Sequence, residues 1–280
     1  MQHTRSLLSL SVALAVSSCS EKETDIPAPG PAHQTHAVAN IQRPWFEDQT
    51  SRRGITFTYQ SGHRERYLFP EIMGGGAALA DFDNDGDLDA YLVQGGGALS
   101  DERPPNQLFM NDGHGFFEAK VDAGGAGDTG YGMGATTGDY DNDGDVDLYV
   151  TNVGTNVLYR NDGDLRFTDV TATAGVGDPG FSASATFLDL DNDGDLDLFV
   201  TNYINWRLAT ETECFSKPSG YSMADYCWPT AYESPARDRL YRNNGDGTFT
   251  DVSDDAGLAL AYGNGLGVVG LDANNDGPLP

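Results

Sequence analysis

The chain has 280 residues, with 43 Asp or Glu against 16 Lys or Arg, so its formal net charge is -27 at pH 7. This charge makes nucleic acid, anionic membrane surfaces and heparin-like polyanions poor partners. Hydrophobic residues make up 39% of the sequence and include 13 Tyr and 13 Phe, which excludes a fully disordered chain. The 35 glycines are too many for a helical protein.

The first residues have the pattern of a secretory signal, with a basic start and an apolar run from Leu7 to Val16. The run is too short for a bilayer span, which needs about 20 residues. It ends at Val16-Ser17-Ser18-Cys19, which is similar to the lipobox of bacterial lipoproteins. We expect residues 1–18 to be a signal peptide and Cys19 to be lipidated. Ordinary signal cleavage, with Cys19 incidental, is the alternative.

Both interpretations predict export. Lipidation predicts an outer-membrane or cell-surface lipoprotein that touches the membrane only through its lipid anchor, and ordinary cleavage predicts a secreted or periplasmic protein. Residues 19–44 are rich in Pro, Ala and polar residues without an apolar period, which indicates a disordered linker. Residues 45–280 then form the folded domain.

A nine-residue acidic phrase occurs three times in this domain, as DFDNDGDLD from Asp81, DYDNDGDVD from Asp139 and DLDNDGDLD from Asp189. The phrases hold 15 of the 43 acidic residues and recur every 50 to 60 residues, a period that is typical of propellers and other repeat architectures. The negative charge is therefore clustered rather than spread over the chain.

The flanks of the phrase repeat as well. A run rich in small residues precedes each copy (74–80, 132–138 and 182–188), and an apolar run follows it (90–93, 148–152 and 198–202). Segments 106–119, 156–171 and 238–253 then carry an Asn-Asp-Gly or Asn-Asn-Gly turn between aromatic-rich runs, which indicates a hairpin. Four antiparallel strands per repeat predict an all-β fold, a β-propeller of four-stranded blades.

The acidic phrase predicts a calcium site. Asp at positions 1, 3, 5 and 9 supplies four carboxylates, Gly at position 6 permits a sharp turn, and position 7 offers a backbone carbonyl. With a water, these groups reach the six or more oxygen ligands that Ca²⁺ prefers, whereas Mg²⁺ fits less well. The candidate site residues are Asp81, Asp83, Asp85, Asp87 and Asp89; Asp139, Asp141, Asp143, Asp145 and Asp147; and Asp189, Asp191, Asp193, Asp195 and Asp197. Within these sets we expect the position-7 side chains of Asp87, Asp145 and Asp195 to be solvated.

A fourth copy begins at Asp272 and retains Asn274, Asp276 and Gly277, but its ninth position is Pro280, which has no ligand side chain. We therefore expect about three Ca²⁺ sites and a fourth that is weak or empty. An EF-hand is excluded because its position-12 Glu is absent: Leu92, Val150 and Val200 stand there.

Together these segments resemble FG-GAP/VCBS repeats, as in the integrin α-chain propeller. More closely, segments 54–62, 67–89 and 225–253 resemble the ASPIC/UnbV-containing, cartilage-acidic-protein-like family. The resemblance covers residues 45–280 and implies a Ca²⁺-bearing propeller, commonly of seven blades, in secreted or surface proteins. Here the repeats span about 54–127, 130–177, 181–259 and 262–280, which is three complete repeats and the start of a fourth.

The chain departs from that family in lacking later blades and the C-terminal ASPIC/UnbV module, so we expect a partial ring from a truncated product. Segment 45–55 is similar to segment 167–176, which ends a blade, and could complete a last blade.

The third repeat contains an insertion of some 30 residues at about 204–235, rich in aromatic residues and containing Cys214 and Cys227. In an exported protein, two cysteines 13 residues apart predict a disulfide. Trp206, Tyr226 and Trp228 are candidate ligand-binding residues, for a sugar ring or a protein partner. The alternative is that the insertion covers a hydrophobic surface of its own blades.

No catalytic motif is found: the sequence lacks G-x-S-x-G, H-E-x-x-H and a phosphate-binding glycine loop. We therefore expect a non-catalytic, calcium-binding surface module for adhesion or ligand binding. The alternative is the scaffold of an extracellular carbohydrate-active enzyme, a polysaccharide lyase or glycosidase, because propellers host both classes.

Overall fold

The computed structural model describes residues 46–96, 103–217, 220–232, 234–258 and 263–271. The chain divides into two compact units, Met1–Glu47 and Asp48–Pro280, and the elements below belong to the second. The signal peptide, the linker, Cys19 and the fourth acidic copy with Asp272, Asn274 and Asp276 lie outside the described residues and stay predictions. None of the helices in the described ranges is long and apolar enough to span a membrane.

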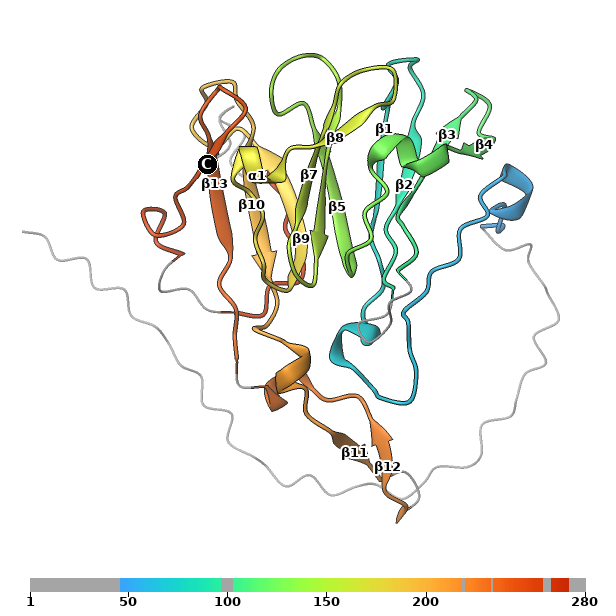
Figure 1. The fold of residues 1–280 in the computed structure, drawn as a ribbon, viewed down its shortest axis with the longest axis vertical. Helices are drawn as coiled ribbons and strands as arrows, with labels where there is room; N and C mark the ends of the chain where they lie inside the picture. Colours follow the sequence, from blue (N-terminus) through green and yellow to red (C-terminus); the bar gives the residue numbers. More distant parts are fainter. Residues whose placement is uncertain (1–45, 97–102, 218–219, 233, 259–262, 272–280) are drawn as a thin grey trace, which may run out of the picture. The chain divides into compact units, whose positions relative to one another are not determined.

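Three four-stranded antiparallel sheets make up most of the fold (Figure 1). Sheet 1 contains β1 (Ala77–Ala80), β2 (Asp89–Leu92), β3 (Gln107–Asn111) and β4 (Phe117–Ala119). Sheet 2 contains β5 (Gly132–Gly138), β6 (Asp147–Asn152), β7 (Val157–Asn161) and β8 (Phe167–Asp169). Sheet 3 contains β9 (Ser182–Leu188), β10 (Asp197–Asn202), β13 (Arg239–Asn243) and β14 (Phe249–Asp251). Each strand pairs with the next along the chain within its sheet, so the predicted all-β class and four strands per repeat are confirmed.

The acidic phrase lies in the same place in every sheet. It begins after the first strand, and its ninth residue is the first residue of the second strand. The first and second strands pair directly, as Ala80 with Asp89 and Gly138 with Asp147, so the phrase closes a hairpin. All three acidic loops therefore lie at corresponding ends of their sheets.

The first strands β1, β5 and β9 pack against one another in that order. Glycine permits this close approach: a Cβ added to Gly76 would lie 2.6 Å from Cα of Gly134, below any normal contact. The glycine-rich runs of the sequence are therefore the strands where neighbouring sheets meet most closely. The described strands do not close the three sheets into a ring.

Short helical turns connect successive sheets. Turn η3 (Val121–Gly125) places Gly125 against the backbone of Phe167 in sheet 2, and α1 (Thr171–Ala174) places Gly175 near that of Phe249 in sheet 3. Turn η1 (Ser51–Arg53) similarly places Gly54 against Phe117 of sheet 1. Segment 48–54 thus lies against sheet 1 in the same way as the turn after sheet 1 lies against sheet 2 and the turn after sheet 2 lies against sheet 3.

The hydrophobic core consists of layers between sheets. One cluster joins Tyr91 and Leu108 of sheet 1 to Leu148 of sheet 2, and a second joins Tyr149 of sheet 2 to Leu198 of sheet 3. Each of these side chains is fully buried, and burial of one such side chain contributes roughly 1.5–3 kcal/mol. The sheets are therefore held together by side chains that face their neighbours.

The insertion in sheet 3 has secondary structure of its own. It contains η4 (Leu208–Thr210), a hairpin of β11 (Cys214–Ser216) and β12 (Met223–Asp225), and η6 (Pro229–Ala231). Its two ends meet, because Ile204 pairs with Pro235 and the Asn205 amide donates to the Ser234 carbonyl (2.8 Å). The hairpin extends away from the three sheets (Figure 1).

A third core cluster lies at the base of the insertion. Phe69, from η2 (Phe69–Ile72), is fully buried and contacts the rings of Phe181, Tyr203 and Tyr232. The base of the insertion therefore covers apolar surface, while its outer part leaves Phe215, Tyr221 and Trp228 exposed.

Candidate metal centres

Each acidic loop turns through two left-handed residues. Gly86, Gly144 and Gly194 at position 6 have φ of 94°, as the glycine signal in the sequence indicated. Asn84, Asn142 and Asn192 at position 4 have φ near +60°, a conformation that Asn adopts more readily than most residues. The role of this Asn was not predicted from the sequence, although its recurrence at position 4 of all three copies indicates that it has one.

The turns bring carboxylate oxygens together in every copy. Groups of three ligand oxygens lie within 4.8 Å of one another in Asp81, Asp83 and Asp85; in Asp139, Asp141 and Asp147; and in Asp189, Asp191 and Asp193. These groups contain members of each predicted site. Backbone N–H groups orient the first Asp of each loop, as Gly144 N donates to Asp139 Oδ2 at 3.0 Å.

Some of these oxygens are buried without a protein partner. Oδ1 of Asp141 and Oδ1 of Asp189 are inaccessible and accept no hydrogen bond from the described residues. A buried acceptor without a donor costs about 1–3 kcal/mol, and more when it is charged. A hard cation bound by oxygen ligands removes this cost, so the donor set fits Ca²⁺.

The ninth residue of each loop also has a structural task. Asp89, Asp147 and Asp197 are almost fully buried, and each accepts two backbone N–H bonds. In sheet 2, Asp147 accepts from Tyr140 N (3.0 Å) and Asn161 N (2.8 Å). The carboxylate therefore ties the start of the loop to the third strand, and its remaining lone pairs stay available to a cation.

The seventh position was predicted wrongly as solvated. Asp145 and Asp195 are half-buried, and Oδ1 of each accepts an amide N–H from the position-4 Asn of the preceding loop. These bonds are Asn84 Nδ2 to Asp145 (2.7 Å) and Asn142 Nδ2 to Asp195 (2.8 Å). Neighbouring acidic loops are thus joined side chain to side chain.

The first loop supports this interpretation. Oδ1 of Asp87 is buried and has no partner, because the described residues contain no acidic loop before it. A second kind of hydrogen bond also joins neighbouring sheets. Asn161 Nδ2 of sheet 2 donates to the Phe82 carbonyl in the loop of sheet 1 (2.9 Å), and Asn243 Nδ2 of sheet 3 donates to the Tyr140 carbonyl in the loop of sheet 2 (2.8 Å). Each candidate centre is therefore positioned by the adjacent sheet as well as by its own.

Burial and mutual repulsion raise the carboxyl pKa values in the loops. Burial raises the pKa of Asp89 to about 6 and that of Asp147 to about 8, against the lowering effect of the backbone N–H bonds. The pKa values of Asp83 and Asp141 are raised by burial and then by the adjacent carboxylates. A bound cation favours the charged carboxylates and reverses these shifts.

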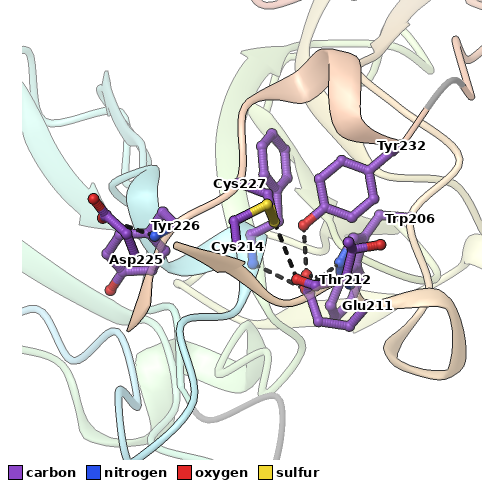
Figure 2. Close-up of a disulfide and its surroundings, with 9 residues drawn as sticks. Trp206, Glu211, Thr212, Cys214, Asp225, Tyr226, Cys227 and Tyr232 are labelled. Carbon is purple, nitrogen blue, oxygen red and sulfur yellow. Dashed lines mark hydrogen bonds between the residues drawn. A yellow bond between two sulfur atoms is a disulfide. The ribbon is translucent and has the colours of Figure 1, made fainter. Parts of the chain in front are cut away.

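The insertion is organised around Glu211 (Figure 2). Its carboxylate accepts hydrogen bonds from Trp206 Nε1 (2.6 Å), the Tyr232 hydroxyl (2.5 Å) and the backbone N–H of Phe69 (3.1 Å). A disulfide joins Cys214 to Cys227, across the start of the hairpin. Glu211 therefore fixes the base of the insertion to η2, and the disulfide closes the hairpin.

The three candidate ligand-binding aromatics do not form one surface. Trp206 is half-buried at the base of the insertion and lines two grooves, of about 520 and 370 Å³, that contain neither Tyr226 nor Trp228. Trp228 is 81% exposed on the outer part. The Tyr226 hydroxyl points instead toward Glu71 and His63.

The pair of Glu71 and His63 was not identified from the sequence. His63 Nδ1 lies 2.6 Å from Glu71 Oε2, the Glu71 side chain is 2% exposed, and the Tyr226 hydroxyl is 3.3 Å from both groups. The three residues come from segments about 150 residues apart, so only the fold brings them together. A carboxylate–imidazole pair beside a phenol can position a proton on the histidine.

The fold and the loops define an all-β repeat protein with a carboxylate cluster in each repeat. Comparison with known families agrees: the FG-GAP-like repeat matches residues 81–150 and 139–200, so the chain contains FG-GAP-like repeats. No curated protein matches the sequence.

One solved structure is that of a lectin from Agrocybe aegerita, described as specifically recognising non-reducing terminal N-acetylglucosamine. It is similar at 17% sequence identity with a TM-score of 0.32. The likeness covers 65% of this chain and 54% of that one, so the chain spans about half the length of this relative.

Proposed function

We propose that this chain is a calcium-stabilised β-propeller module of the cell surface or extracellular space, which binds a protein or carbohydrate ligand without catalysis. The observation that carries the proposal is the threefold recurrence of clustered carboxylate oxygens, some buried without a donor. FG-GAP-like repeats and exposed aromatic side chains on a disulfide-closed insertion support it. Export as a lipoprotein anchored at Cys19, and membership of the ASPIC/UnbV-containing family, belong to the same proposal.

In this proposal calcium has a structural role. Each ion neutralises carboxylates that otherwise repel one another, and it fixes a loop that also contacts the neighbouring loop through the Asn-to-Asp bonds. Because the ligand oxygens come together only in the folded chain, binding and folding are linked. Ion binding at one loop therefore supports the interface between two sheets.

The test is calorimetric titration of the chelator-stripped protein with Ca²⁺, together with thermal melting. We expect about three ions per chain and a large rise in Tm on calcium addition. Asp141→Ala removes a carboxylate from the second centre and lowers the stoichiometry by one. Asp255→Ala changes the charge equally at an exposed residue outside the loops and serves as the control. A melting temperature that is unchanged by excess EDTA contradicts the proposal.

The second candidate is an extracellular carbohydrate-active enzyme, favoured by the His63, Glu71 and Tyr226 cluster. Buried Glu71 orients the imidazole, and the phenol of Tyr226 offers a proton at 3.3 Å, which is an acid–base arrangement. Incubation with acidic polysaccharides tests it through the release of reducing ends or unsaturated uronates. Tyr226→Phe should abolish the release, whereas Tyr221→Phe, at a 78% exposed position, should not. Absence of any product rules out this activity for those substrates.

A further inference from the structure

A groove of about 520 Å³ runs between the end of β10 and the base of the insertion. Its lining combines one indole, Trp206, with three guanidinium groups, those of Arg207, Arg237 and Arg239, and one buried carboxylate, that of Asp178. Three of the 16 basic residues of the chain therefore line one groove. Asn202 and Asn205 also line the groove, and their Nδ2 groups donate to Asp178 and to the Pro235 carbonyl, respectively.

The indole of Trp206 is held in a fixed orientation. Its Nε1 donates to Glu211 at 2.6 Å, and its backbone lies where the two ends of the insertion pair. Trp206 also lines a second groove of about 370 Å³, which is lined by Arg103 as well. A rigid aromatic face beside polar groups is a common arrangement for binding a sugar ring, because little ordering is needed on binding.

The three guanidinium groups differ in what already neutralises them. Arg239 pairs with Asp251 at 3.1 Å and lies 3.8 Å from Asp178, and Arg237 pairs with Asp254 through Nη2. The Nε atom of Arg237 is buried without a hydrogen-bond partner, and Arg207 has no ion pair within the described part of the chain. Among the three guanidinium groups, that of Arg207 is therefore the one left for a ligand.

The acidic loops do not cancel this charge. They precede the first residue of each second strand, whereas Asn202 of the groove is the last residue of β10. A strand of six residues separates the two ends by roughly 17 to 20 Å, which is about twice the Debye length of about 8 Å in physiological salt. A single anionic group therefore responds mainly to the charges at the groove, which are those of the three arginines and of Asp178, Asp251 and Asp254. A long polyanion would also meet the acidic remainder of the chain.

We propose that this groove binds a saccharide through one carboxylated sugar, whose ring stacks on Trp206 and whose carboxylate pairs with Arg207. The proposal rests on the ligand-binding function proposed above and specifies its ligand class. Arginine suits this task, because its planar donors match a carboxylate and its charge is permanent. Uronic and sialic acids both provide the required carboxylated ring.

The test is calorimetric titration of the calcium-loaded full chain with three probes: a glucuronate-terminated disaccharide, sialyllactose and neutral lactose. We expect one or both acidic probes to bind at one site and lactose to bind at least about tenfold more weakly. Arg207→Ala should weaken binding of the acidic probe about tenfold, and Arg207→Lys should restore part of the loss. Arg242→Ala, an exposed arginine of β13 outside the groove, should leave binding unchanged.

Equal binding of lactose and the acidic probes overturns the assignment of the carboxylate, and so does equal weakening by Arg207→Ala and Arg242→Ala. Tighter binding of heparin or of an acidic peptide than of either saccharide also overturns it. If no saccharide binds while calcium still raises Tm, this inference fails and the calcium module stands. If calcium has no effect on Tm either, the proposed function fails as well.

Discussion

At the scale of single residues, the position-4 asparagines do two things at once. Asn142 adopts a left-handed conformation and donates its amide to Asp195 of the next loop at 2.8 Å. Asn142→Gly keeps the backbone conformation and loses only the amide, so we expect a loss of about 1 kcal/mol in the free energy of unfolding. Asn142→Asp places a second carboxylate beside Asp195 and should destabilise more. Denaturant unfolding in saturating Ca²⁺ measures both changes.

The control for this prediction is Asn192→Gly. Asn192 has the same φ of about +60°, yet its side-chain amide has no partner in the described part of the chain. The substitution should therefore change stability by no more than a few tenths of a kcal/mol. Equal effects of Asn142→Gly and Asn192→Gly would mean that the inter-loop bond contributes nothing measurable.

At the scale of elements, the strands can be predicted from the sequence because their signal, a short run of residues bounded by turn residues, is local to each strand. The runs at 132–138 and 182–188 coincide with β5 and β9, and the hairpin turns lie where Asn and Gly indicated them. The first run is longer than its strand, since β1 begins only at Ala77, after Gly74–Gly76. Repetition of a local pattern three times makes such boundaries readable from the sequence alone.

Contacts between distant elements are not readable in this way. The position-7 side chains appeared solvated because their donors, Asn84 and Asn142, lie about 60 and 50 residues away on another sheet. The pairing of Tyr226 with Glu71 spans 155 residues. The hairpin of the insertion was not predicted, because its strands have only three residues each, too few to show alternation. The ligand types of the metal centres were predictable, but the bonds that position them were not.

At the scale of the whole molecule, the clustered carboxylates oppose folding until a cation is bound. Raised carboxyl pKa values mean that the folded chain without calcium holds more protons than the unfolded chain at pH values between about 4 and 8. Its stability should therefore increase as the pH falls through this range. Calcium requires the charged carboxylates, so the calcium-loaded protein should respond in the opposite direction and lose stability as acid displaces the ion.

The measurement is Tm between pH 8 and pH 5, in excess chelator and in excess Ca²⁺. Acidification should raise Tm in chelator and lower it in calcium, so the two curves converge. Acidification also reduces the self-repulsion that comes from the net charge of -27, and this favours the folded chain at lower pH. About 0.5 M salt screens that effect. The desolvation of Asp89 and Asp147 is not screened, because both side chains are buried. If the pH dependence in chelator disappears at high salt, it comes from the overall charge, and the buried carboxylates do not control stability.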